Sequence, residues 1–259
     1  PKQFLLHVHP SPDELGTVYR PDVPIVATAR TFTAALEGLR PEKAPAWSKW
    51  LTEARRSYEA YSEPVPTPGS VKLEQVVRQV SELLPEDGIV TNGAGNYTAF
   101  VHRYFTYKRY RTELAPTSGS MGYGLPAAIA AKLARPASPV VCFAGDGCFL
   151  MTGQEMATAM QYGLPIVVIV ANNGMYGTIR MHQERSYPER VIATSLVNPD
   201  FAAFARSFGA CGEVVEKTAD FRPAFRRALE ADKPALIELR LDPEAITPGK
   251  SLSDLRTQS

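Results

Sequence analysis

The fold is decided by two stretches, Ser138-Pro-Val-Val-Cys-Phe-Ala-Gly-Asp-Gly147 and Pro165-Ile-Val-Val-Ile-Val-Ala-Asn-Asn173. Each opens with a continuous, largely β-branched apolar run, which is typical of a strand buried on both faces. Residues 152–162 between them have helical character and end before Gly163. A strand, loop, helix and strand in this order predict a parallel pair, whose C-terminal ends lie at the same edge of the sheet. We therefore expect Asp146 and Asn173 to lie close together.

The residues that end these two strands suit a magnesium–phosphate site. Mg²⁺ takes oxygen ligands, usually one or two from protein, and completes its shell with phosphate and water. Asp146 offers a carboxylate and Asn173 an amide oxygen. Gly145 and Gly147 would let the backbone approach a phosphate closely, next to a helix N-terminus that favours an anion. Either dipeptide alone would indicate a surface turn, because Gly, Asp and Asn dominate turns. Their spacing at the ends of two buried strands favours the binding site.

Composition excludes several classes of function. The 259 residues carry 28 basic and 27 acidic side chains, a net charge of +1, which gives no electrostatic basis for binding nucleic acid or an anionic membrane. No apolar run reaches the length of a membrane span, and no signal-peptide pattern is present. The three cysteines, Cys142, Cys148 and Cys211, include no CxxC pair and indicate a reducing compartment. We therefore expect a cytoplasmic location.

The chain is predicted to have four parts. Two strand-like runs and a helix near the N-terminus form an α/β segment too small for its own core. The chain begins at Pro1, without Met, and reaches a strand almost at once, so we expect it to be a fragment of something longer. From residue 71 onward, strands and helices alternate, which predicts a doubly wound, mainly parallel sheet with helices on both faces. The expected parts are a partial α/β segment (1–45), a linker (46–70), the main domain (71–241), and a tail that lies on the surface or closes over a site (242–259).

Two further glycine-rich loops precede helices. Asn92-Gly-Ala-Gly-Asn96 follows the strand 88–91 and is either a tight turn or a loop that presents backbone amides to phosphate. The second loop, 117–126, contains three glycines and leads into an alanine-rich helix. Met121 lies within it, and its spacing alone favours a place in the core.

Together, these loops resemble the pyrophosphate-binding domain of thiamine-diphosphate-dependent enzymes, and most closely the acetolactate synthase-like branch. Gly145-Asp-Gly147, 24 intervening residues (148–171) and Asn172-Asn173 match the signature of that superfamily. The segments 145–158 and 119–130 also resemble acetolactate synthases almost residue for residue. The resemblance covers residues 71–241, while the first 40 residues resemble the end of the family's middle domain.

This resemblance implies that the chain binds thiamine diphosphate and Mg²⁺. Asp146, the Asn173 side chain and the backbone oxygen of Met175 would bind the metal. Met121 becomes the residue that bends the cofactor, in place of the core role that spacing favoured, and the Gly119 carbonyl would meet the cofactor's amino group. The resemblance also assigns cofactor contacts to Ala94, Gly95, Asn96, Gly145, Gly147, Cys148 and Tyr176.

The implied reaction is decarboxylation of a 2-oxo acid such as pyruvate, followed by transfer or protonation of the resulting carbanion. The implied assembly is a homodimer or homotetramer. The family's catalytic glutamate belongs to a separate pyrimidine-binding domain, contributed by the same or a partner subunit, and nothing here corresponds to it. We therefore expect this chain alone to be inactive and to bind the cofactor weakly.

The substrate stays open at this point. Acetolactate synthases carry a methionine and a tryptophan where this chain has Thr178 and His182. His182 could act as an acid or base, or as a polar pocket group, and a surface position is equally compatible with the sequence. Whether FAD binds in the full-length enzyme is also open.

Three other functions compete with this interpretation. One is another thiamine-diphosphate lyase, acting on an aromatic or acyl-CoA substrate like the benzoylformate or oxalyl-CoA decarboxylases. A second is a dinucleotide- or flavin-binding module, but Gly93-Ala-Gly95 is followed by Thr98 where GxGxxG needs glycine. The third is a catalytically silent domain that keeps the fold.

Overall fold

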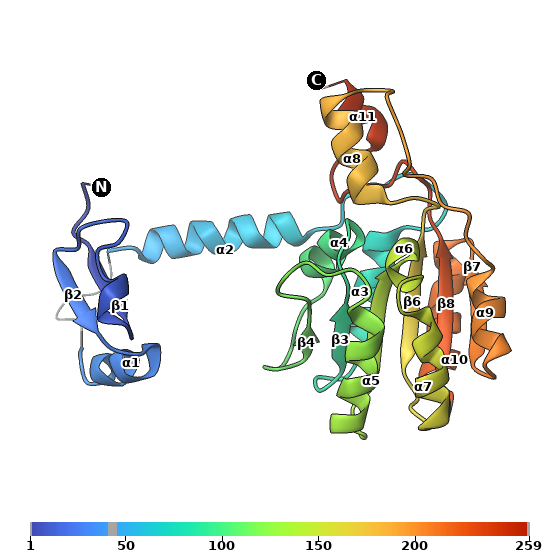
Figure 1. Ribbon diagram of the computed structural model, residues 1–259, viewed down its shortest axis with the longest axis horizontal. Coiled ribbons are helices and arrows are strands. Elements are labelled where there is room, and N and C mark those ends of the chain that lie inside the picture. The colour runs from blue at the N-terminus through green and yellow to red at the C-terminus, as the bar shows by residue number, and fades with distance from the viewer. Residues whose placement is uncertain (1, 41–45, 258–259) are drawn as a thin grey trace. The chain divides into compact units, whose positions relative to one another are not determined.

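A computed structural model describes residues 2–40 and 46–257 and divides the chain into two compact units, 1–57 and 58–259 (Figure 1). In the first unit, the strands β1 (Leu6–His9) and β2 (Val23–Val26) pair in parallel, with Leu6 opposite Val23. The short helix η1 (Pro12–Glu14) and the helix α1 (Ala29–Glu37) complete it. Helix α2 (Ser48–Ser62) runs across the sequence boundary between the units.

The second unit contains a six-stranded sheet in the order β4-β3-β5-β6-β8-β7. Every adjacent pair in it is parallel, so the prediction of a doubly wound, mainly parallel α/β sheet is confirmed. Its elements are α3 (Leu73–Leu83), β3 (Ile89–Asn92), α4 (Tyr97–Tyr104), β4 (Glu113–Leu114), α5 (Gly124–Ala134), β5 (Val140–Gly145), α6 (Asp146–Phe149), η2 (Gly153–Glu155), α7 (Met156–Gln161), β6 (Val167–Asn172), α8 (Gly177–Ser186), α9 (Phe201–Ser207), β7 (Cys211–Val215), α10 (Thr218–Glu230), β8 (Ala235–Arg240) and α11 (Leu252–Arg256).

Both faces of the central strands are buried, as their continuous apolar sequences predict. Along β5, Val141 and Phe143 join the core cluster formed with α3, α4 and α10. The alternate residues Val140 and Cys142 join a second cluster with α5, α7 and α9. Figure 1 shows α5, α7 and α9 in front of the strands. Hydrophobic layers therefore pack on both faces of β5 and fix where its C-terminal end lies.

The strand register brings the polar ends of β5 and β6 together. Gly145 lies opposite Ala171, and Asn172 lies opposite Arg240 of β8. The backbone N–H of Gly174 donates a hydrogen bond of 2.9 Å to Asp146 Oδ2. The expected meeting of the two motifs at one edge of the sheet is therefore confirmed.

Short elements differ from the sequence-based expectations. The segment expected as one helix, 152–162, is divided into η2 and α7, and the tight loop expected at Asp146 is the helical turn α6. Gly153 lies where a Cβ atom would be 2.8 Å from the Phe149 ring, so this ring packs against the first residue of η2. Strand β4 and helix α11 were not anticipated, while the boundaries drawn for the four parts of the chain stay predictions. In the part of the chain that the structure describes, no helix is both long and apolar enough to cross a membrane.

Candidate cofactor site

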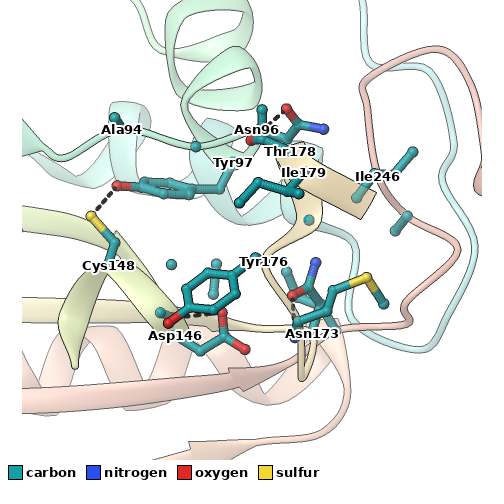
Figure 2. A pocket seen from close by; sticks show the side chains of 18 of the residues that line it. Ala94, Asn96, Tyr97, Asp146, Cys148, Asn173, Tyr176, Thr178, Ile179 and Ile246 are labelled. Carbon is teal, nitrogen blue, oxygen red and sulfur yellow. Dashed lines mark hydrogen bonds between the residues drawn. The ribbon is translucent and has the colours of Figure 1, made fainter. Parts of the chain in front are cut away.

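A pocket lies at the C-terminal edge of the sheet, with about 600 Å³ of empty space that includes an opening to solvent. Three loops supply its polar wall: the β3–α4 loop, the β5–α6 junction and the β6–α8 loop (Figure 2). The apolar wall comes from α3, α4 and the chain after β8, including Leu73, Phe100 and Ile246. The tail therefore contributes to the pocket, which is one of the two positions expected for it.

Most of the predicted site residues line this one pocket. They are Ala94, Gly95, Asn96, Met121, Gly145, Asp146, Gly147, Cys148, Asn173, Met175 and Tyr176. Gly119 and His182 are exposed and are not among the lining residues. Gly119 has φ +69°, and a Cβ atom there would meet nothing within 4 Å. The roles assigned to Gly119 and His182 stay predictions.

Asp146 is the acidic centre of the pocket, and its side chain is nearly inaccessible. Its Oδ1 accepts a 2.8 Å hydrogen bond from the N–H of its neighbour Gly147. Its Oδ2 accepts from the Gly174 N–H and, at 2.8 Å, from Asn198 Nδ2. Burial raises the pKa of the Asp146 carboxyl above its ordinary value, and these hydrogen bonds oppose that rise. A cation beside this carboxylate would favour its ionised form.

A buried polar chain connects Asp146 to the interior of the sheet. Asn198 Nδ2 also donates to Asn172 Oδ1 at 2.9 Å, and Asn172 Nδ2 donates to Glu238 Oε1 at 2.6 Å. Glu238 is fully buried and also contacts Arg240 Nε at 3.0 Å. Asn198 was not anticipated because it belongs to no recognisable motif and lies 26 residues beyond Asn172. The only signal in the sequence is its place in Asn198-Pro-Asp200, just before α9.

The β6–α8 loop is held by the segment 194–196. The Tyr176 N–H donates to the Thr194 carbonyl, and the Leu196 N–H donates to the Gly174 carbonyl, both at 2.8 Å. Met175 and Ser195 form an isolated antiparallel bridge between these hydrogen bonds. The backbone at Met175 is therefore fixed by a second segment of chain, and its position does not depend on the loop alone.

The available donor atoms fit a hard cation such as Mg²⁺. They are one buried carboxylate at Asp146, an amide oxygen at Asn173 and the backbone carbonyl of Met175, all oxygen donors. Among residues 2–40 and 46–257, no group of three or more His, Cys, Asp or Glu side chains could hold a metal ion. A few protein oxygens with room for further ligands are what Mg²⁺ in a phosphate complex needs.

Side-chain hydrogen bonds connect the three loops. Thr178 Oγ1 donates to Asn96 Oδ1 at 2.9 Å, which ties the β3–α4 loop to α8. Cys148 Sγ accepts from the Tyr97 hydroxyl at 3.4 Å and from the Gly122 N–H at 3.1 Å (Figure 2). Gly93 is needed beside it, because a Cβ atom there would lie 2.2 Å from Cys148 Sγ. Cys148 is therefore a junction between loops as well as a pocket residue.

Met121 lies where the core meets the pocket, and its role in bending the cofactor stays a prediction. Its side chain is partly buried and packs against the core cluster that contains Phe143. The same residue lines the pocket, as do the apolar side chains of Leu73 and Ile246. Met121 is therefore an apolar lining residue whose side chain is also packed against the core.

Glycine loops and oxygen donors that gather at the C-terminal ends of a parallel α/β sheet are typical of proteins that bind nucleotides or diphosphates. A profile of the family described as "Thiamine pyrophosphate enzyme, C-terminal TPP binding domain" matches residues 93–239, more than half of the chain. The chain belongs to this family, and its predicted resemblance to acetolactate synthase-like, thiamine-diphosphate-dependent enzymes is confirmed.

Curated relatives agree with this assignment. An acetolactate synthase of Mycobacterium avium is 32% identical over 251 residues, which cover 92% of this chain and 40% of that protein. A probable acetolactate synthase large subunit of Methanocaldococcus jannaschii is 29% identical over 260 residues, covering 96% and 44%. A putative thiamine pyrophosphate-containing protein of Bacillus subtilis is 35% identical over 181 residues, covering 70% and 31%. The chain thus spans less than half the length of each of these relatives.

Proposed function

We propose that the pocket holds the diphosphate end of thiamine diphosphate through Mg²⁺, as part of an enzyme that decarboxylates a 2-oxo acid. The observation that carries this proposal is the meeting of Asp146 with the Asn173–Met175 loop beside two glycine loops in one pocket. When bound, the cofactor supplies an electron sink for decarboxylation, and the protein supplies shape, metal and electrostatics.

Each wall of the pocket has its own part in this proposal. Asp146, the Asn173 amide oxygen and the Met175 carbonyl hold the cation. Backbone amides of Cys148 and of the loop 94–96 hold the diphosphate beside Gly147, whose own N–H donates to Asp146 Oδ1. Met121 holds the bend of the cofactor, supported by its contact with the core. Gly145 allows close approach, and the Tyr176 ring covers Gly147, where a Cβ atom would lie 2.6 Å from it.

The reaction needs a group that this pocket does not contain. Asp146 is the only acidic residue among those lining the pocket in the described part of the chain, and its carboxylate is assigned to the metal. A second carboxylate, from a pyrimidine-binding domain of the same or a partner subunit in a homodimer or homotetramer, would complete the site. A cytoplasmic location is in keeping with three free cysteines.

The assignment of the metal site is tested by calorimetry with thiamine diphosphate, with and without Mg²⁺. We expect metal-dependent binding by the full-length protein, and at least a tenfold weaker affinity in Asp146→Ala, because the only carboxylate donor is lost. Asp232→Ala, which removes an exposed carboxylate outside the pocket, is the matched control and should bind like the wild type. Binding that is independent of Mg²⁺, or unchanged in Asp146→Ala, would exclude this site.

The substrate is tested separately, once cofactor binding is established. Pyruvate is compared with an aromatic 2-oxo acid and an acyl-CoA substrate, using CO₂ release as the readout. Preference for pyruvate supports the acetolactate synthase-like reaction. Turnover of only one of the other two substrates would assign the chain to a different lyase with the same cofactor site.

A further inference from the structure

We propose that Asn198 is a positioning residue that fixes the orientation of the Asp146 carboxylate for the metal. Asn198 is not among the residues that line the pocket, and it reaches the proposed metal site through its hydrogen bond to Asp146. The inference rests on the proposed Mg²⁺ site and adds to it a residue from a segment, 194–200, that no sequence motif connects with metal binding.

The hydrogen-bond polarity leaves only one orientation for the Asn198 amide. Glu238 is a carboxylate and accepts only, so Asn172 must present its Nδ2 to Glu238 and its Oδ1 to Asn198. Asn198 must then donate to Asn172 through Nδ2. A flipped Asn198 amide would place its oxygen against two other oxygens, Asn172 Oδ1 and Asp146 Oδ2. The buried Glu238 thus dictates which atom of Asn198 faces Asp146.

This arrangement restricts how the Asp146 carboxylate can turn. Nδ2 of Asn198 and the N–H of Gly174 both donate to Oδ2, while the N–H of Gly147 donates to Oδ1. Donors from three separate segments therefore hold the carboxylate plane and leave one lone pair, on Oδ1, for a cation. The Asn198 Oδ1 atom is buried and has no hydrogen-bond partner in the described structure. The two hydrogen bonds that Nδ2 donates are therefore what hold the Asn198 side chain.

A positioning role has a signature that a purely structural role lacks. Mg²⁺ demands near-ideal octahedral geometry, whereas Ca²⁺ accepts variable coordination. A carboxylate that is free to rotate should therefore lose more affinity for Mg²⁺ than for Ca²⁺. Partners that orient metal ligands typically change metal affinity by about 10–100-fold when they are replaced.

The test measures thiamine diphosphate binding to the full-length protein by calorimetry, in saturating Mg²⁺ and in saturating Ca²⁺. In Asn198→Ala, we expect the Kd in Mg²⁺ to rise about tenfold or more, with a smaller rise in Ca²⁺. Asn198→Asp keeps the shape but cannot donate when ionised, so we expect the same change in selectivity. Asp200→Ala is the control, since it removes the N-cap of α9 two residues away and should lower thermal stability without changing the Mg²⁺/Ca²⁺ ratio.

Four results would overturn the inference. One is wild-type selectivity in both Asn198 variants, and a second is an equal loss of affinity for both ions. A third is tighter Mg²⁺ binding in Asn198→Asp, which would show that charge and not orientation governs the site. The fourth is unfolding of both Asn198 variants at a temperature at which Asp200→Ala stays folded, which would assign Asn198 a structural role. Wild-type protein without metal-dependent binding would instead refute the proposed function itself.

Discussion

Single residues in the pocket serve as connections between loops, and Cys148 is the clearest example. Its thiol accepts from a buried tyrosine hydroxyl and from a backbone amide on two different loops. Burial is also the main reason why the pKa of Tyr97 lies well above its ordinary value, with Cys148 adding to the shift. The hydroxyl therefore stays protonated and acts as a donor throughout the physiological range. These connections hold the polar walls of the pocket in place before any ligand arrives.

Removing the Cys148 thiol should destabilise the fold because the buried Tyr97 hydroxyl loses the acceptor of its hydrogen bond. We expect Cys148→Ala to lower the free energy of unfolding by about 1–3 kcal/mol, the cost of an unsatisfied buried hydroxyl. Tyr97→Phe should then cost less in the Cys148→Ala background than in the wild type. Urea titration of the single and double variants gives this coupling, and Cys211→Ala, at a less buried thiol, is the control. Strictly additive effects of the two substitutions would contradict the connection.

Among single residues, the sequence predicts those site residues that belong to motifs with distinctive spacing. Asp146 and Asn173 were predicted to meet because buried strands end at both, and they do line one pocket. Asn198 was not predictable, because its role arises from the polarity of a buried amide chain and not from a local pattern. Met121 shows a third situation, in which spacing indicated the core, the family resemblance indicated the pocket, and the structure contains both contacts.

Among the elements, α8 packs against α11, the helix of the C-terminal tail. A separate apolar cluster joins Met181 of α8 to Ile246, Leu252 and Leu255. Beside it, the fully buried Glu184 of α8 contacts Arg180 on its own helix at 2.7 Å and Arg256 of α11 at 2.9 Å. Because Ile246 also lines the pocket, docking of the tail and closure of the pocket are connected.

Docking of α11 should depend on pH through Glu184. Hydrogen bonds from Arg256, the Glu189 N–H and Arg180 lower the pKa of this carboxyl from 4.5 to about 2, against the opposing effect of burial. The stabilisation is therefore fully present above pH 4.5 and is lost as the pH falls towards 2. Two other acidic groups, Glu244 and Glu189, also face Arg256 and add to the attraction.

The measurement for this prediction is hydrogen exchange of the α11 amides between pH 7 and pH 3, corrected for intrinsic exchange. We expect constant protection down to about pH 5 and falling protection below it. Glu184→Gln should weaken docking at pH 7 by about 3–5 kcal/mol, since a buried pair loses one charge. The difference from the wild type should shrink as the pH falls, so that the pH dependence is flattened. Unchanged protection in Glu184→Gln would show that the apolar cluster alone holds the tail.

Long apolar strands could be predicted from the sequence, and short elements could not. The strands β5 and β6 have nearly continuous apolar sequences and are buried along their full length. Strand β8 begins with the apolar run 235–237. Strand β4 has two residues, too few for any periodic signal. Helix α11 follows a polar, proline-containing segment, and its capping box, Ser251 with Asp254, becomes meaningful only once Leu252 and Leu255 have a surface to cover.

Across the whole molecule, burial is unevenly distributed between the two units. No described residue of 1–57 is buried, whereas β5 and β6 are buried along their full length. Local opening is governed by the apolar contacts that must be broken, so the two regions should open with very different free energies.

We therefore expect amides in the β1–β2 ladder to exchange within the dead time of a standard deuterium experiment. Amides in β5 and β6 should exchange only through global unfolding and should follow the stability measured by urea titration. Peptide-level mass spectrometry of the full chain separates the regions, because they lie far apart in the sequence. Comparable protection in both units would show that a partner surface covers and stabilises the first unit.

The strand ends that hold Asp146 and Asn173 have a consequence for how such proteins diversify. The positions of Asp146 and Asn173 depend on a strand register that two hydrophobic layers fix. Thr178, Ile179 and Ile246 line the same pocket but belong to α8 and the tail. Substitutions in the second group leave the sheet untouched. We expect related proteins to have kept Asp146 and Asn173 while substitutions in α8 and the tail changed which substrate they accept. Recombination at the boundaries of α8 would then yield proteins with new substrate specificities that still bind the same vitamin-derived cofactor.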